Sequence, residues 1–195
     1  SLTEFTIPNS VTSIGSYAFQ DCSKLKAIVI PESISSIAEK TFMGCSSLTE
    51  VTIPNTVTSI GSEAFRDCCS LSTITLPEQI TQISYRTFQG CSSLTSIVIP
   101  ELVKSIWGEA FYMCSNLKSV VIGSSVTNIT NYSFMGCPAI RTVICKPTTP
   151  PVFNDESYNF EVYSDAVLYV PAGCTSAYQN AEVWRKFKNI AEEGQ

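Results

Sequence analysis

Residues 48–70 read LTEVTIPNTVTSIGSEAFRDCCS, and the chain up to residue 145 is this stretch written again with the same spacing. We call the six complete copies units 1 to 6; they cover residues 2–139. Each copy, and a partial seventh, opens with a leucine or isoleucine 23 residues after the last: Leu2, Leu25, Leu48, Leu71, Leu94, Leu117 and Ile140. A fixed short period of this kind indicates a repeat protein whose units pack on their neighbours.

The first third of each unit alternates apolar and polar residues, which is the period of a β-strand. In unit 3 we expect Val51 and Ile53 to point into the core, and Glu50 and Thr52 to point outward. A proline then ends the strand, because it lacks an N–H group and fixes its own φ. Gly123 takes its place in unit 6, and the prolines are Pro8, Pro31, Pro54, Pro77 and Pro100.

The rest of the unit predicts a second short strand and then a helical turn. Residues 57–60 (VTSI) are short and rich in β-branched side chains. Ala64, Phe65 and Cys68 have the spacing that shares one face of a helix. Because one unit buries too little alone, we expect units to stack about 4.7–4.9 Å apart in a parallel sheet. The inward positions of unit 3 are Leu48, Val51, Ile53, Val57, Ile60, Phe65 and Cys68.

Nine cysteines raise the question of a metal site, a redox array or a disulfide framework. Six recur in the repeat on the core side, without histidine or C-x-x-C, which favours buried, reduced thiols: Cys22, Cys45, Cys68, Cys91, Cys114 and Cys137. Parallel Cβ directions oppose bridges between units. Cys145 and Cys174, which flank the start of the tail, are the one pair for which a bridge stays open. Cys69 should point outward as a reactive thiol.

Composition argues against several classes of function. Only 15% of residues are charged and the net charge is −5, so there is no basic surface for nucleic acid. No apolar run approaches the roughly 18 residues that span a bilayer. The chain has no histidine, which removes the usual general base and the commonest metal ligand. We therefore predict no enzymatic activity, no catalytic residue, no metal and no cofactor.

The tail from Lys146 departs from the repeat. A proline-rich connector at 146–152 precedes a strand predicted at 166–170. Thr175 or Ser176 then offers an N-cap for a helix through about Phe187. The buried face of that helix should carry Tyr178, Ala181, Trp184 and Phe187. Since a solenoid needs its last turn covered, we predict a repeat domain at 1–145 and a capping region at 146–195.

The pattern L-x-x-[IV]-x-[IV] at this period is of the leucine-rich-repeat type. The variant with Ile53-Pro54, Ala64-Phe65 and Cys68, together with the LYVPAG stretch at 168–173, resembles the BspA-like leucine-rich-repeat family of bacterial and protozoan surface proteins. The fold we predict is an α/β solenoid: a leucine-rich-repeat right-handed superhelix with a parallel sheet face, short second strands, helical turns and a C-terminal cap. The resemblance implies a non-catalytic cell-surface or secreted protein that adheres to host extracellular components or to other cells.

The outward strand positions form two neighbouring rows, which we call the sheet face. Val and Thr are favoured in any strand, so the rows have a purely structural interpretation as well as one as a docking surface for a partner protein. Trp107 in the turn region is a further exposed aromatic candidate. The face comprises Glu4, Thr6, Ala27, Val29, Glu50, Thr52, Thr73, Thr75, Ser96, Val98, Ser119 and Val121.

Two functional hypotheses follow. The first is a protein-binding or adhesion module that uses the sheet face, with a host extracellular-matrix or surface protein as partner. The alternative is a structural spacer within a larger surface protein. Leu2, Phe5 and Ile7 should form a turn with its outer side uncovered, so we expect further repeats or a cap upstream of Ser1, or self-association there.

Overall fold

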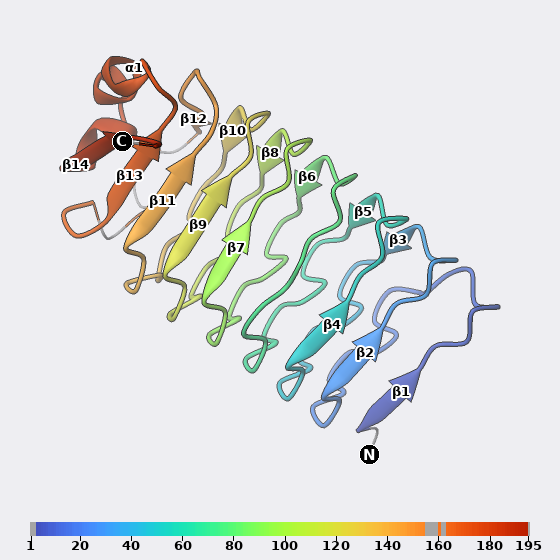
Figure 1. Cartoon of the computed structure of the whole chain (residues 1–195). Helices are drawn as coiled ribbons and strands as arrows, with labels where there is room; N and C mark the ends of the chain where they lie inside the picture. Colours follow the sequence, from blue (N-terminus) through green and yellow to red (C-terminus); the bar gives the residue numbers. More distant parts are fainter. Residues whose placement is uncertain (1–2, 155–159, 161–162, 195) are drawn as a thin grey trace.

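The computed structural model describes residues 3–154, 160 and 163–194. The chain coils into an elongated stack of about eight turns, with its two ends at opposite ends of the stack (Figure 1). Every strand pair in the described residues is parallel, and equivalent residues of successive units lie opposite one another. The predicted parallel solenoid is therefore confirmed, whereas the right-handed course of the superhelix stays a prediction.

The front sheet carries the sheet face and falls into two parts (Figure 1). The first part contains, in spatial order, β1 (Glu4–Thr6), β2 (Ala27–Val29) and β4 (Glu50–Thr52). The second part contains β7 (Ser96–Val98), β9 (Ser119–Ile122), β11 (Thr142–Cys145), β13 (Val167–Val170) and β14 (Asn189–Glu192).

The back sheet is built from the predicted second strands of the units and is also divided. Its first part pairs β3 (Ser36–Ile37) with β5 (Ser59–Ile60). Its second part contains β6 (Gln82–Ile83), β8 (Ser105–Ile106), β10 (Asn128–Ile129) and β12 (Val152–Phe153).

A stack of phenylalanines runs through the core between the two sheets and the turns. Ring centroids of neighbours lie 5.2–5.6 Å apart from Phe19 to Phe134, and Phe160 continues the stack at 4.8 Å. Of the seven inward positions predicted for unit 3, six are buried and Ile53 is half-buried. In the first turn Phe5 is 41% exposed while Ile7 is buried; Leu2 lies outside the described residues.

The helical character predicted for the repeat turns is not confirmed. In the described residues each turn is a series of tight hydrogen-bonded turns, interrupted twice per unit by a residue with positive φ; in unit 3 these are Glu63 (57°) and Asp67 (58°). A left-handed residue cannot continue an α-helix, so no helix forms. The N–H groups of Glu63, Phe65 and Asp67 donate to the carbonyls of Tyr85, Thr87 and Gln89 at 2.7–2.9 Å. We call this run of bonds between units the turn ladder.

Every second unit has glycine at the second left-handed position, between units with other residues: Asp21, Gly44, Asp67, Gly90, Met113 and Gly136. A Cβ added to Gly44 would lie 2.2 Å from Oδ1 of Asp21, and one added to Gly90 would lie 2.3 Å from Oδ1 of Asp67. The aspartate side chain thus occupies the space over the glycine of the next unit.

The cysteine ladder is buried, as predicted, from Cys45 to Cys137, while Cys22 at its start is half-buried. Each of the five buried thiols lies 3.1–3.2 Å from a phenylalanine carbonyl 26 residues earlier, to which it donates; Cys68, for example, donates to Phe42. Cys145 and Cys174 are both free, so the bridge left open for them is not formed.

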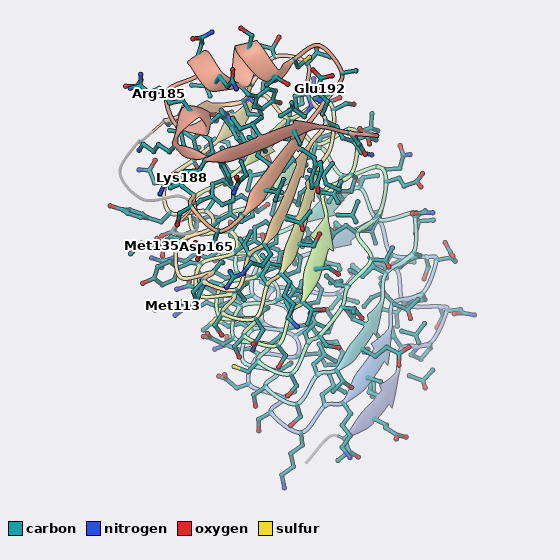
Figure 2. The ribbon with its side chains drawn as sticks, turned by 60° about the vertical axis from the view of Figure 1, so that its left-hand side comes forward. Met113, Met135, Asp165, Arg185, Lys188 and Glu192 are labelled. Carbon is teal, nitrogen blue, oxygen red and sulfur yellow. The ribbon has the colours of Figure 1, made fainter. Side chains whose placement is uncertain are left out.

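The tail continues both sheets and departs from the predicted single helix. α1 (Thr175–Asn180) is followed by extended backbone at Ala181 and then by the 3-10 helix η1 (Trp184–Lys186). The prediction of an N-cap at Thr175 or Ser176 is wrong. The N-cap residue is Cys174, without a side-chain cap, and the Thr175 hydroxyl instead donates to Oε1 of Glu192, next to α1 (Figure 2).

Two aromatic side chains of the tail anchor it to the proline-rich connector. The Tyr178 hydroxyl donates to the Pro147 carbonyl at 2.6 Å, and the Trp184 indole N–H donates to the Pro151 carbonyl at 2.8 Å. Both side chains are fully buried, and the predicted burial of Phe187 is also confirmed. The interruption at Ala181 redirects the chain between these two anchors. β14, which follows them, is an additional strand that the sequence did not reveal.

Candidate functional site

The sheet face is assembled in register from successive strands. Glu4, Ala27 and Glu50 lie opposite one another, as do Thr6, Val29 and Thr52. The same two rows continue beyond unit 4, where Ser96 pairs with Ser119 and Val98 with Val121. Ala27, Ser119 and Val121 are half-buried, and the other face residues are exposed. The structure therefore brings the predicted residues onto one surface, in two groups.

Unit 4 interrupts this surface. Residues 72–76 form no strand, although sequence analysis predicted one with Thr73 and Thr75 facing outward. In the described part of the chain, one backbone hydrogen bond joins this segment to a neighbouring unit, from Thr95 N–H to the Ser72 carbonyl. β4 and β7 are consequently edge strands in the middle of the stack, with no strand between them (Figure 1). Leu76 offers a local reason, because the other five units have β-branched isoleucine at that position.

The back sheet is interrupted at the same place. In neighbouring units the N–H of Gly61 or Trp107 donates to the isoleucine carbonyl of the preceding unit at 2.9 Å. At the equivalent position of unit 4, the Ser84 hydroxyl takes the Ile60 carbonyl at 2.6 Å. The hydroxyl replaces the backbone donor, and β5 and β6 therefore belong to different sheets. The turn ladder, in contrast, passes unbroken from unit 3 to unit 4.

Trp107 is 43% exposed, as predicted, and lies at the end of β8. Its indole N–H donates to Oε1 of Gln82 at 3.3 Å. Tyr85 is exposed one unit earlier and donates its hydroxyl to Glu109 at 3.0 Å, while the Arg86 guanidinium lies 4.6 Å from the Tyr85 ring centre. These aromatic side chains belong to the back-sheet and turn region, so they are separate from the sheet face.

A row of alternating charges on the turns is the surface feature that sequence analysis missed. It occupies the first left-handed position of successive units: Lys40, Glu63, Arg86 and Glu109. Lys40 lies 3.5 Å from Glu63, and Arg86 makes two hydrogen bonds to Glu109 at 2.9 and 3.1 Å. Reading the sequence down this one column of the repeat would have revealed the alternation.

Ion pairing with Arg66, which lies beside the row, and with Lys40 outweighs the effect of partial burial on the pKa of Glu63. Burial alone would raise the pKa of this carboxyl, but the hydrogen bond from Arg66 at 2.7 Å and the Lys40 charge lower it below its ordinary value. The same hydrogen bond raises the pKa of Arg66. The charges thus satisfy one another and line the turns as a structural row.

Other chemistry on the described surface is sparse. Cys69 is exposed, as predicted, and its thiol lies 3.4 Å from the Asp67 carbonyl. Among the residues described, no group of three or more histidine, cysteine, aspartate or glutamate side chains is placed to hold a metal ion. Within the same residues, no helix has the length and apolarity needed to cross a membrane.

Comparison with known families gives a match for more than half of the chain. The BspA type leucine rich repeat region matches residues 1–106, in six copies. The chain belongs to this family. The resemblance found in Ile53-Pro54, Ala64-Phe65 and Cys68 is therefore confirmed. The family's repeat corresponds to one turn of the solenoid described above. No curated protein matches the chain.

Solved structures of bacterial leucine-rich-repeat proteins share this fold. A leucine rich repeat protein of T. pallidum superposes with a TM-score of 0.70 at 26% identity, covering 84% of this chain and 76% of that one. A leucine rich cell surface protein from Faecalibacterium prausnitzii gives 0.62 at 30% identity, covering 73% and 48%. A leucine-rich repeat protein from Eubacterium ventriosum gives 0.65 at 32% identity, covering 71% and 37%. The chain thus spans less than half the length of the last two.

Proposed function

We propose that this BspA-type chain is a non-catalytic protein-binding and adhesion module whose sheet face contacts a partner protein. The observation that carries the proposal is the alignment of exposed and half-buried, mostly uncharged residues in register across both parts of the front sheet. Val29 and Val98 are each 58% exposed at the same repeat position. Apolar and hydroxyl side chains cost less to desolvate than charged ones when a partner covers them.

We further propose that the protein acts at the cell surface or in secreted form, with a host extracellular-matrix or surface protein as partner. The similarity to a leucine rich cell surface protein supports the location. The net charge of −5 and the scarcity of basic side chains favour a protein over nucleic acid.

The division of labour along the chain is also a proposal. Residues 1–145 would provide the binding array, and residues 146–195 its cap. The cap is supported by the way β13 and β14 extend the front sheet and β12 extends the back sheet, and by the buried aromatic anchors at Tyr178 and Trp184. An array without such an end would expose the apolar side chains of its last turn.

The experiment compares two lysine pairs in adjacent units. Val29→Lys with Thr52→Lys alters the sheet face, and Ser36→Lys with Ser59→Lys alters exposed positions of the back sheet. Binding to immobilised, purified extracellular-matrix proteins is measured by surface plasmon resonance. The face pair should weaken binding at least tenfold and the back pair less than twofold. Equal weakening by the two pairs would refute binding through the sheet face. Absence of binding by the unmodified chain would favour the alternative, a structural spacer within a larger surface protein.

A further inference from the structure

The interruption of the front sheet at unit 4 leaves an edge strand in the middle of the stack, with a cleft beside it. β7 is the edge of the longer front part, and residues 72–76 beside it form no strand. Ile74 is half-buried there, whereas the equivalent residues Ile28 and Ile97 are buried. Backbone N–H and C=O groups along an unpaired strand edge are the groups to which another extended chain binds.

A cleft of about 560 Å³ lies between units 4 and 5 at this point. Its apolar lining includes Ile74, Leu76, Ile99 and Pro100, with Val98 and Leu102 exposed beside them. This volume falls in the range of sites that enclose a ligand of several side chains, which is about 300–1,000 Å³. The cleft can therefore take at least one large apolar side chain.

Two carboxylates line the same cleft, and they differ in their partners. Glu101 accepts hydrogen bonds from Lys146 Nζ and from the Ser124 N–H, each at 2.7 Å, and these bonds lower its pKa to about 2. The carboxylate of Glu78 has no ion-pair partner in the described part of the chain. The lining therefore retains one uncompensated negative charge beside an apolar surface, which favours a basic group on the occupant.

We propose that this cleft binds an extended segment of a partner protein, which places one apolar side chain between units 4 and 5 and a lysine or arginine at Glu78. The free edge of β7 accounts for the extended conformation, the apolar lining for the buried side chain, and Glu78 for the basic residue. The inference rests on the proposed protein-binding function and names the chemistry of the segment that the sheet face selects.

The chain supplies matched controls for the test. Glu32 follows Pro31 in unit 2 as Glu78 follows Pro77 in unit 4, and both glutamates are exposed. Val152 is, like Val98, an exposed valine in a strand, but its strand β12 belongs to the back sheet. Each cleft variant can thus be compared with the same substitution outside the cleft.

The probe is an immobilised positional-scanning library of linear heptapeptides, incubated with the purified chain. Selected peptides should contain a large apolar residue with lysine or arginine within two positions of it. In fluorescence titrations with these synthetic peptides, Val98→Lys and Glu78→Lys should raise Kd at least tenfold, and Val152→Lys and Glu32→Lys less than twofold. Amide shifts on binding should concentrate in residues 72–76 and 96–102 of the ¹⁵N-labelled chain.

The outcomes separate this inference from the broader function. Absence of any selected motif, or equal effects of Glu78→Lys and Glu32→Lys, overturns the cleft; in the second case binding elsewhere on the sheet face still stands. Selection of the motif without binding to matrix proteins supports the cleft and refutes the matrix partner. Unchanged unfolding midpoints of all four variants exclude loss of folding as the cause.

Discussion

The turn side and the sheet side of the stack are built from the same repeat but respond differently to unit 4. On the turn side, the Phe65 and Phe88 rings stack 5.6 Å apart and the turn ladder continues between their units. On the sheet side, residues 72–76 form no strand, so β4 and β7 are each unpaired on the side that faces unit 4. Contacts between units therefore come from two sets: the strand pairs of the sheets, and the turn ladder with its phenylalanine stack. Between units 3 and 4 the strand pairs are absent, and the second set holds the stack together.

The largest expected effect comes from disrupting the phenylalanine stack that joins units 3 and 4. Phe88→Ala should cost about 3–5 kcal/mol, because it empties one position of a buried aromatic stack. Since strand pairing is absent between units 3 and 4, the substitution should also uncouple the two ends of the stack. Urea unfolding followed by circular dichroism should then show two transitions.

Phe111→Ala is the matched control, because units 5 and 6 are joined by both sheets. It should cost a similar free energy but retain a single transition. A single transition in both variants would mean that the turn side is not the only connection between units 3 and 4.

The buried thiols should make the turn side sensitive to alkali. Burial raises the pKa of Cys45 from 9.0 to about 12. A group whose pKa is raised on folding stabilises the fold below its unfolded pKa, and this contribution is lost as pH rises from about 9 towards 12. Each pH unit within that window should cost about 1.4 kcal/mol for this thiol.

The measurement is the free energy of unfolding between pH 8 and pH 11, taken from urea titrations. Cys45→Ala should decline less steeply above pH 9 than the unmodified chain, whatever its stability at pH 8. Cys69→Ala, at an exposed position, should leave the slope unchanged. Parallel curves for all three chains would show that burial of Cys45 has no such effect.

A smaller effect is expected from repairing the sheet side. Leu76→Ile restores the residue that the other units have, and should stabilise the chain by up to about 1 kcal/mol, the span of strand propensities. Amide hydrogen exchange should slow in residues 72–76. The reverse change in a paired unit, Ile99→Leu, should speed exchange around β7. If Leu76→Ile alters neither stability nor exchange, the leucine does not cause the interruption of the front sheet.

The smallest effect is expected on the sheet face itself. Thr52→Ala should change the free energy of unfolding by about 0.5 kcal/mol or less, because its side chain is exposed. Val57→Ala in the same unit removes a fully buried side chain and should cost several times more. Equal losses in the two variants would mean that the inward and outward assignments are wrong.

The sequence predicted those features that depend on a pattern shared by all units. Alternation predicted that Val51 is buried and Thr52 exposed, and the constant interval predicted the phenylalanine and cysteine ladders. The turns escaped prediction because helical spacing of Ala64, Phe65 and Cys68 also fits tight turns with left-handed residues between them. The spacing of side chains gives no information on the φ angle of the residues between them. Glutamate is rarely found in the left-handed region, so the positive φ of Glu63 could not be predicted from its residue type.

Features peculiar to one unit were harder to predict. The interruption at unit 4 involves a serine that competes for a backbone carbonyl and a leucine in place of isoleucine, and neither alters the apolar pattern. The sheet face could be drawn from the pattern, but the cleft within it could not. In the tail, the helix was predicted from the spacing of Tyr178 and Trp184, whereas their anchors at Pro147 and Pro151 redirect the chain between them.

The alternating charges on the turns give the array a parity. Lys40, Glu63, Arg86 and Glu109 change sign from unit to unit, and glycine recurs at every second unit beside them. Deleting one unit, such as residues 48–70, would bring Lys40 against Arg86. Deleting two successive units, residues 48–93, would bring Lys40 against Glu109. Gly44 would then take the place beside Met113 that Gly90 occupies now. Within units 2 to 5, removing two units therefore preserves the pairing of opposite charges, whereas removing one does not.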